Sequence, residues 1–270
     1  MFELVLFIAL AGTAAGGLWD LKTTEIPDEL PALLITLAIF YWFINAASTG
    51  NFLPLIASLA IGTFVTAIGW LAYHYGQWGG ADALMLGAIF YLIPLHPTIS
   101  LFPMAYVFNM FVVSFVYLLL YTIIIGIRNR EVISLFRNDL KHSWKMIVGI
   151  PVLFAAVYTI PILIYDMIFI FPWELIILIF LLCLFWRYGK VIEEKHFTRD
   201  ISVDNLKEGD VIFESKKWIG LTKKEVEKLK QTHETVKIKE GVRFAPVFFL
   251  TLLATLLFGN ILLNLLLNFA

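Results

Sequence analysis

The sequence contains one cysteine, Cys183, and only 15% of its 270 residues are charged. A single cysteine excludes an intramolecular disulfide framework and a cysteine-based zinc site, and it leaves the redox compartment open. With 60% hydrophobic residues, the chain is more apolar than one soluble core requires. The composition therefore predicts an integral membrane protein.

The N-terminal stretch lacks the basic segment with which a secretory signal peptide begins, so we interpret residues 1–19 as a retained first span. A membrane-crossing helix needs about 20 mostly apolar residues. By this measure the apolar runs predict eight spans, at residues 2–19, 31–47, 53–73, 81–94, 102–126, 146–164, 171–187 and 244–268. Prolines interrupt the sixth and seventh runs, so six spans with residues 146–187 as a re-entrant hairpin is the alternative.

The distribution of basic residues tests this map independently of hydropathy. Lys22 follows the first span, five basic residues lie between Arg128 and Lys145, and fourteen lie between Arg187 and Arg243. With eight or six spans, all 20 lysines and arginines lie on one side of the membrane, and the positive-inside rule makes that side cytoplasmic. We therefore predict an all-α, multi-pass protein of the cell membrane, with both termini outside.

Four regions follow from this map. Residues 1–126 are expected to form a membrane-embedded catalytic core, residues 127–187 a basic cytoplasmic loop plus a hydrophobic hairpin, residues 188–243 a small α+β cytoplasmic domain, and residues 244–270 a last transmembrane helix. Within the third region, "ISVDNLKEGDVIFE" suggests a hairpin turning at Gly209-Asp210. "LTKKEVEKLK" predicts a helix, with Thr222 and Glu225 at capping-box spacing, and "TVKIKEGVRF" predicts a last strand.

Two aspartates share one predicted membrane depth. Asp20 lies at the cytoplasmic end of the first span, and Asp82 lies at the cytoplasmic start of the fourth. Carboxylates beside hydrocarbon are costly unless they face protein or water, which makes them functional candidates. Two neighbouring carboxylates tend to share one proton, so one can act as a base toward water while the other polarises a carbonyl. The pattern is typical of peptide hydrolysis, and it leaves open which residue has which role.

Other interpretations of these residues remain open at this stage. Asp82 could cap the helix that it begins. The two aspartates could instead bind ions or relay protons in a transporter or channel, although transport sites more often lie near the midplane of paired halves. We see no internal repeat in the chain.

Two short stretches resemble a known family. "DLKTTEIPD", Asp20 to Asp28, resembles the first signature of prepilin peptidases, and "GGAD" resembles the G-x-G-D signature with their second aspartate. The chain is similar to archaeal-type prepilin or preflagellin peptidases, which are G-x-G-D aspartyl proteases. Ala81 stands where the strict motif has glycine, and archaeal members tolerate a small or hydrophobic residue there. Residues 206–259 are also similar to the C-terminal region of larger archaeal members.

The resemblance implies that Asp20 and Asp82 are the catalytic pair, with Gly79, Gly80 and Ala81 as supporting motif residues. It implies no metal and no organic cofactor. Its substrates would be precursors of type IV pilin-like subunits or archaellins, cut at the cytoplasmic face between a short basic leader and a hydrophobic helix. Three acidic residues beside Asp20 are candidate contacts for such a leader: Glu25, Asp28 and Glu29. Membrane lipid is the other expected partner, and nucleic acid is not expected.

Overall fold

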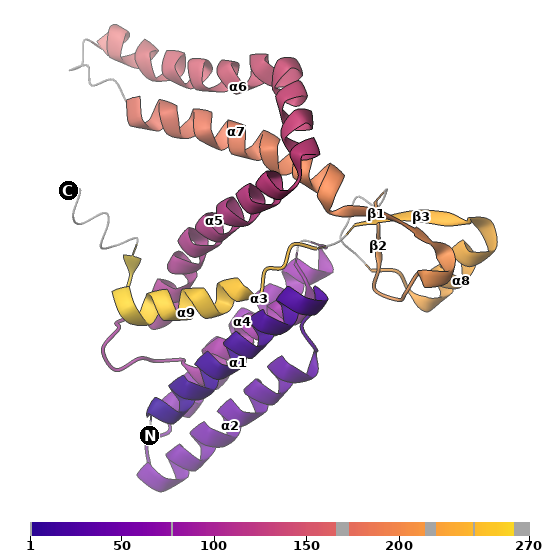
Figure 1. The fold of residues 1–270 in the computed structure, drawn as a ribbon. Coiled ribbons are helices and arrows are strands. Elements are labelled where there is room, and N and C mark those ends of the chain that lie inside the picture. The colour runs from indigo at the N-terminus through magenta and orange to yellow at the C-terminus, as the bar shows by residue number, and fades with distance from the viewer. Residues whose placement is uncertain (1, 77, 166–172, 214–219, 240, 262–270) are drawn as a thin grey trace. The chain divides into compact units, whose positions relative to one another are not determined.

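A computed structural model describes residues 2–76, 78–165, 173–213, 220–239 and 241–261. The chain divides into two compact units, the first made of residues 1–117 and 199–270 and the second of residues 118–198. Figure 1 shows that helices dominate both units. The strands are confined to a small module that follows α7 and precedes α9 in the chain. We describe each unit by itself.

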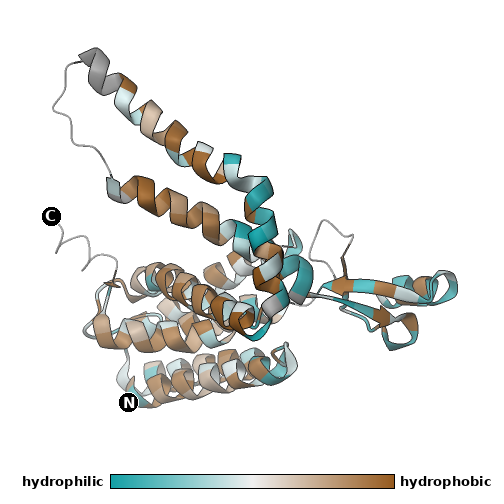
Figure 2. Cartoon of the chain, turned by 45° about the horizontal axis from the view of Figure 1, so that its top comes forward, coloured by the Kyte–Doolittle hydropathy of each residue, from teal (hydrophilic) through white to brown (hydrophobic). Residues whose placement is uncertain are grey.

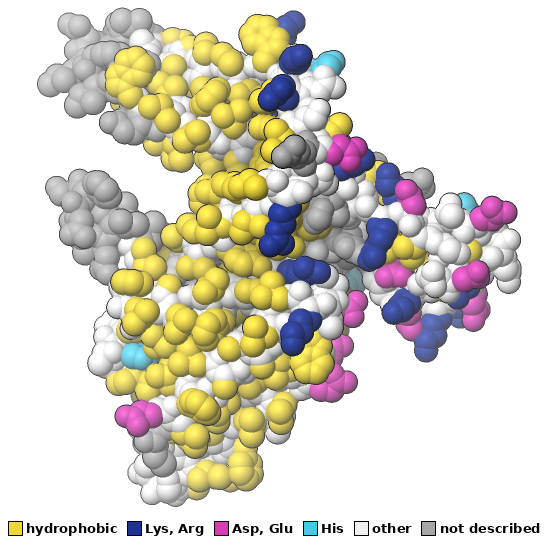
Figure 3. Space-filling view, in the orientation of Figure 1, with side chains coloured by type: hydrophobic (Ala, Val, Ile, Leu, Met, Phe, Trp, Pro, Cys, Tyr) yellow, Lys and Arg dark blue, Asp and Glu magenta, His cyan; other side chains and the backbone are white. Residues whose placement is uncertain are grey.

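Six helices are long and apolar enough to cross a membrane, so the chain is a multi-pass, mainly α-helical membrane protein. They are α1 (Phe2–Thr23), α2 (Glu29–Thr49), α3 (Leu53–His74), α5 (Phe102–Arg128), α6 (Arg130–Tyr165) and α7 (Trp173–His196). Figure 2 shows hydrophobic residues along these helices and hydrophilic ones over the module. In the space-filling view of Figure 3, hydrophobic side chains cover much of the visible helical surface, as lipid-facing helices require.

The prediction of eight full-length spans is not confirmed. Two of the predicted spans, 81–94 and 244–268, correspond to α4 (Gly80–Leu92) and α9 (Pro246–Phe258), which have 13 residues each within the described part of the chain. The alternative of six spans is not confirmed either, because it treated residues 146–187 as a re-entrant hairpin. α6 and α7, which contain most of these residues, are both long and apolar enough to cross a membrane. Residues 262–270 of the last predicted span lie outside the described residues.

The basic segment predicted as a cytoplasmic loop is helical instead. α6 begins at Arg130 and continues to Tyr165, so residues 130–145 belong to the same helix as the apolar run after them. Figure 1 shows that α6 bends within its length. Apolar residues recur among the charged ones at helical spacing, and Val132 is fully buried while Arg137 is exposed. An amphipathic pattern of this kind stabilises a helix where charge alone suggested a loop.

The core of the first unit is built around α4. Nine of its 13 residues are buried, from Ala83 to Leu92. Seven of these nine belong to one hydrophobic cluster with residues of α1, α2, α5 and α9. Side chains from two neighbouring helices satisfy carbonyls at its C-terminal end: Trp42 Nε1 donates to the carbonyls of Tyr91 and Leu92 (both 3.1 Å), and Ser58 Oγ donates to that of Tyr91 (2.6 Å). α4 can therefore be short because protein surrounds it.

The module contains β1 (Thr198–Ser202), the 3₁₀ turn η1 (Val203–Asn205), β2 (Val211–Ile212), α8 (Lys223–Thr232) and β3 (Thr235–Lys239). The expected helix is confirmed, and Glu225 Oε2 accepts a hydrogen bond from the Thr222 backbone N–H (2.8 Å). The expected last strand is confirmed for Thr235–Lys239, whereas residues 241–244 are not in a strand. The hairpin prediction is wrong. The sheet order is β1-β3-β2, with Ile212 paired to Ile238, so β3 lies between the two strands expected to pair with each other.

Candidate active site

The two aspartates lie at neighbouring ends of two antiparallel helices. Asp20 lies in the last turn of α1 and Asp82 in the first turn of α4. Phe2, which begins α1, contacts His96, which follows α4, with ring centroids 5.1 Å apart. The two helices therefore run in opposite directions, as the predicted topology requires.

A contact between Gly16 and Met85 brings both aspartates to one level. A Cβ on Gly16 would lie only 2.7 Å from Met85 Cε, so the missing side chain makes room for α4 against α1. Asp20 follows Gly16 by four residues, and Asp82 precedes Met85 by three, which is about one helical turn in each case. Because the helices are antiparallel, both turns lead in the same direction. The Asp20 carboxylate accordingly acts electrostatically on that of Asp82.

Asp82 does not occupy the cap position suggested as an alternative. The N-cap of α4 is Gly79, in an extended conformation, and Asp82 is the third residue of the helix. Its Oδ2 atom would lie 2.8 Å from a Cβ on Gly79, so the carboxylate folds back over that glycine. The structure gives the Asp82 carboxylate no hydrogen-bond donor among the described residues.

The other motif positions are compatible with the first turn of α4. A Cβ on Gly80 would make only an ordinary 3.5 Å contact with the ring of Tyr73. Ala81 is half-buried and packs against the core with its methyl group. Of the two glycines, Gly79 is thus the one whose missing side chain leaves room for the second aspartate.

Asp20 has a different environment, made by residues far along the chain. It is 5% exposed, and its Oδ2 atom accepts a hydrogen bond from the backbone N–H of Ala245 (2.9 Å). The segment that carries this donor can approach because Gly17 has no side chain: a Cβ there would lie 3.1 Å from Pro246 Cα. The positive charge of Arg243 also acts on the Asp20 carboxylate, without forming an ion pair among the described residues.

Several residues around the aspartates were not predicted. Gly17 is visible in the sequence as the second glycine of "AAGGLWD", directly after Gly16, but the segment that it contacts is distant in the chain. Arg243 and Ala245 carry no signal of their own, because only the tertiary structure brings residue 245 next to residue 20. Gly69 of α3 is the fourth: a Cβ there would lie 2.9 Å from the Cβ of Ala83, the neighbour of Asp82.

The three acidic residues expected to contact a leader peptide lie in and just after the α1–α2 turn. Glu25, Asp28 and Glu29 are all exposed. Thr23 shapes the turn, because its hydroxyl donates to the carbonyl of Glu25 (2.9 Å). Thr24 adopts a left-handed conformation with φ of 65°. This turn presents three carboxylates to solvent within nine residues of Asp20.

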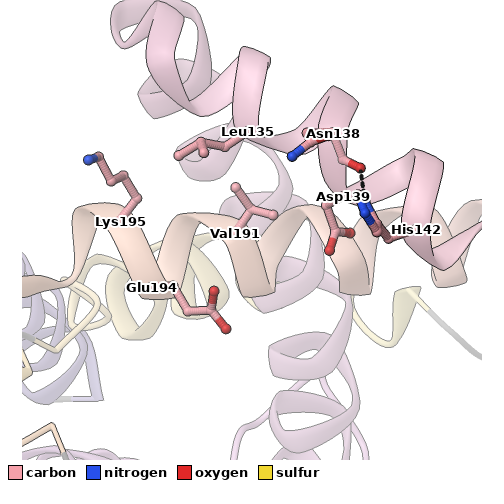
Figure 4. A pocket seen from close by; sticks show the side chains of 7 residues that line it. All are labelled: Leu135, Asn138, Asp139, His142, Val191, Glu194 and Lys195. Atoms are coloured by element: carbon pink, nitrogen blue, oxygen red, sulfur yellow. Dashed lines mark hydrogen bonds between the residues drawn. The ribbon is translucent and has the colours of Figure 1, made fainter.

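A hollow of about 440 Å³ in the second unit is separate from this pair (Figure 4). Of its two carboxylates, that of Asp139 accepts a hydrogen bond from Arg187, whose Nε donates to Asp139 Oδ2 (2.8 Å). His142 Nδ1–H donates to the carbonyl of Asn138 (3.0 Å). The lining residues are Leu135, Asn138, Asp139, His142, Val191, Glu194 and Lys195. Among the described residues, no group of three or more His, Cys, Asp or Glu side chains has the arrangement of a metal site.

Comparison with models of protein families, with curated proteins and with solved structures gives no match for this chain.

Proposed function

We propose that the protein is a membrane-embedded aspartyl endopeptidase of the prepilin or preflagellin peptidase type. Its reaction would remove a short basic leader from type IV pilin-like or archaellin precursors. The observation that carries the proposal is the position of Asp20 and Asp82, whose carboxylates interact at the ends of two antiparallel helices. Among the described spans, Asp20 and Asp82 are the two carboxylates that also lie in the stretches resembling the prepilin peptidase signatures, "DLKTTEIPD" and "GGAD".

The chemistry needs both carboxylates and one proton. In the general scheme, an ionised carboxylate takes a proton from water, and the protonated partner donates to the carbonyl oxygen of the scissile peptide. Like charges held close together favour the singly protonated state that this scheme requires. The reaction as proposed uses no metal and no organic cofactor.

The proposed substrate geometry follows from charge. The positive-inside rule assigns the ends of α1 and α4 that carry the aspartates to the cytoplasmic face. The exposed acidic turn at Glu25, Asp28 and Glu29 would attract a leader rich in lysine and arginine, and the hydrophobic helix that follows the leader would remain in the membrane.

Co-expression with candidate precursors tests the proposal. The intact protein is expected to shorten a precursor by its leader, as seen by mass spectrometry, and Asp20→Asn and Asp82→Asn should each abolish this processing at matched abundance. Asp200→Asn, an exposed aspartate of the module, is the matched control and should process normally. Full processing by either dyad variant would refute the proposal. So would ion flux through proteoliposomes that depends on both aspartates, without any peptide cleavage.

A further inference from the structure

The segment from Arg243 to Pro246 forms one wall around Asp20. It follows β3 and ends at Pro246, the first residue of α9, more than 220 residues after Asp20 in the chain. Three contacts hold it there: the Ala245 N–H to Asp20 Oδ2 (2.9 Å), the Tyr117 hydroxyl to the carbonyl of Arg243 (2.6 Å), and the close approach of Pro246 to Gly17. α5 and α1 therefore both fasten the segment against the carboxylate.

The environments of the two aspartates are unequal. Asp20 receives a backbone N–H donor and the attraction of a cation, both of which favour a negative charge. Asp82 has neither among the described residues, and its carboxylate lies against the backbone of Gly79. A hydrogen bond to a charged acceptor is about twice as strong as one between neutral groups. Where two carboxylates share one proton, the one with the donors holds the charge.

Few other charges face Asp20. α9 has no charged residue, and Lys22 of α1 and Glu29 of α2 are exposed. Among the described residues, the charge that favours ionisation of Asp20 is that of Arg243, from the segment before α9, and the charge of Asp20 in turn disfavours ionisation of Asp82 in α4. The asymmetry of the pair thus depends on the Arg243–Pro246 segment.

We propose that the Arg243–Pro246 segment makes Asp20 the ionised member of the pair, and hence the base, while Asp82 holds the proton. This inference rests on the proposed function and assigns a role to each aspartate. Ala245, Arg243 and Gly17 are positioning residues, because they act through Asp20.

The roles define a balanced reaction. Asp20 takes a proton from water as the water oxygen bonds to the peptide carbonyl carbon, and Asp82 gives its proton to the carbonyl oxygen. In the second step Asp82 recovers a proton from a hydroxyl of the tetrahedral intermediate, the C–N bond breaks, and Asp20 gives its proton to the leaving nitrogen. Both carboxyl groups then return to their initial states.

The direct test replaces the Ala245 amide with an ester, by incorporating lactic acid at position 245, in the full chain. This change removes one N–H donor and retains the shape of the residue. In the pH profile of kcat/KM for a precursor that the intact protein cleaves, the acidic midpoint should move to higher pH by about one pH unit. The matched control is the corresponding ester at Val247, whose N–H donates to the carbonyl of Phe244 (2.9 Å) and not to a carboxylate. It should leave the acidic midpoint in place.

Two side-chain variants provide independent readouts. Arg243→Gln should move the acidic midpoint in the same direction by less, and Arg243→Lys, which retains the charge, should restore it. Gly17→Ala should shift the midpoint because its Cβ would displace Pro246, whereas Gly12→Ala, which faces the flexible side chain of Leu34, should not. Thermal unfolding in detergent identifies any variant that is not folded.

The outcomes separate this inference from the proposed function. If Asp20→Asn or Asp82→Asn still processes the precursor, the proposed function fails and this inference fails with it. If both are inactive while the ester at position 245 leaves the acidic midpoint unchanged, the proposed function stands and only the assignment to Asp20 is overturned.

Discussion

Substituting Gly69 by alanine should reduce cleavage without unfolding the protein. Gly69 is buried in α3, and a Cβ there would lie 2.9 Å from the Cβ and 3.1 Å from the Cα of Ala83. Ala83 directly follows Asp82 and is itself fully buried. The added methyl group therefore meets the backbone of α4 beside the second aspartate, where no flexible side chain can move away.

The size of the effect follows from the distance. Real Cβ contacts are rarely closer than 3.4 Å, so α3 and α4 must separate by about 0.5 Å at this point. A displacement of about 1 Å in a catalytic group can cost about 100-fold in rate. We expect a fall in kcat/KM of about tenfold, which corresponds to about 1.4 kcal/mol. The stability cost should be smaller than the usual 1–3 kcal/mol of overpacking, because replacing a helical glycine by alanine returns about 1 kcal/mol.

Cleavage of a purified precursor in detergent, together with thermal unfolding of each variant, measures both quantities. Gly62→Ala is the matched control, since its Cβ would lie 2.5 Å from the Tyr91 ring at the other end of the same helix contact. Tyr91 is nine residues from Asp82, or about 13 Å along α4, so this control should lose stability but retain kcat/KM. The reasoning fails if folded Gly69→Ala cleaves at the normal rate, or if Gly62→Ala loses as much activity.

Three further predictions concern stability in detergent. Thr24→Gly should raise the free energy of unfolding by about 0.5–1 kcal/mol, because φ of 65° strains a β-branched residue; a lower melting temperature would contradict this. Burial lowers the pKa of His96, so the folded protein binds this proton less readily than the unfolded chain, and melting temperature should fall as pH drops below about 6.5. His96→Asn should flatten that dependence, and an unchanged slope would exclude His96 as its source. Asn109→Leu should destabilise by about 1–3 kcal/mol, because buried Asn109 donates to Thr255 Oγ1 (3.0 Å) and to the carbonyl of Gly259 (2.6 Å); equal unfolding curves would refute that role.

Hydropathy was sufficient to predict a multi-pass helical protein, and periodicity predicted α8 and β3 in the module. Hydropathy could not predict the lengths of α4 and α9, because an apolar sequence has the same hydropathy whether lipid or protein surrounds the helix. The charged residues 130–145 were misread as a loop, since charge marks an interface without excluding a helix. The β1-β2 hairpin was wrong because strand order depends on a partner, β3, that comes later in the chain.

The sequence by itself determined which residues could form a dyad. A carboxylate at the end of an apolar run is visible without a structure, and so is its family-like motif, because both are local in the chain. Only the tertiary structure decided how the two carboxylates differ. The donor to Asp20 is a backbone N–H, which every residue except proline possesses. The residue type at position 245 therefore does not indicate this hydrogen bond. Its selection depends on a close approach at Gly17 between segments that are distant in sequence, and such an approach exists only in the folded chain.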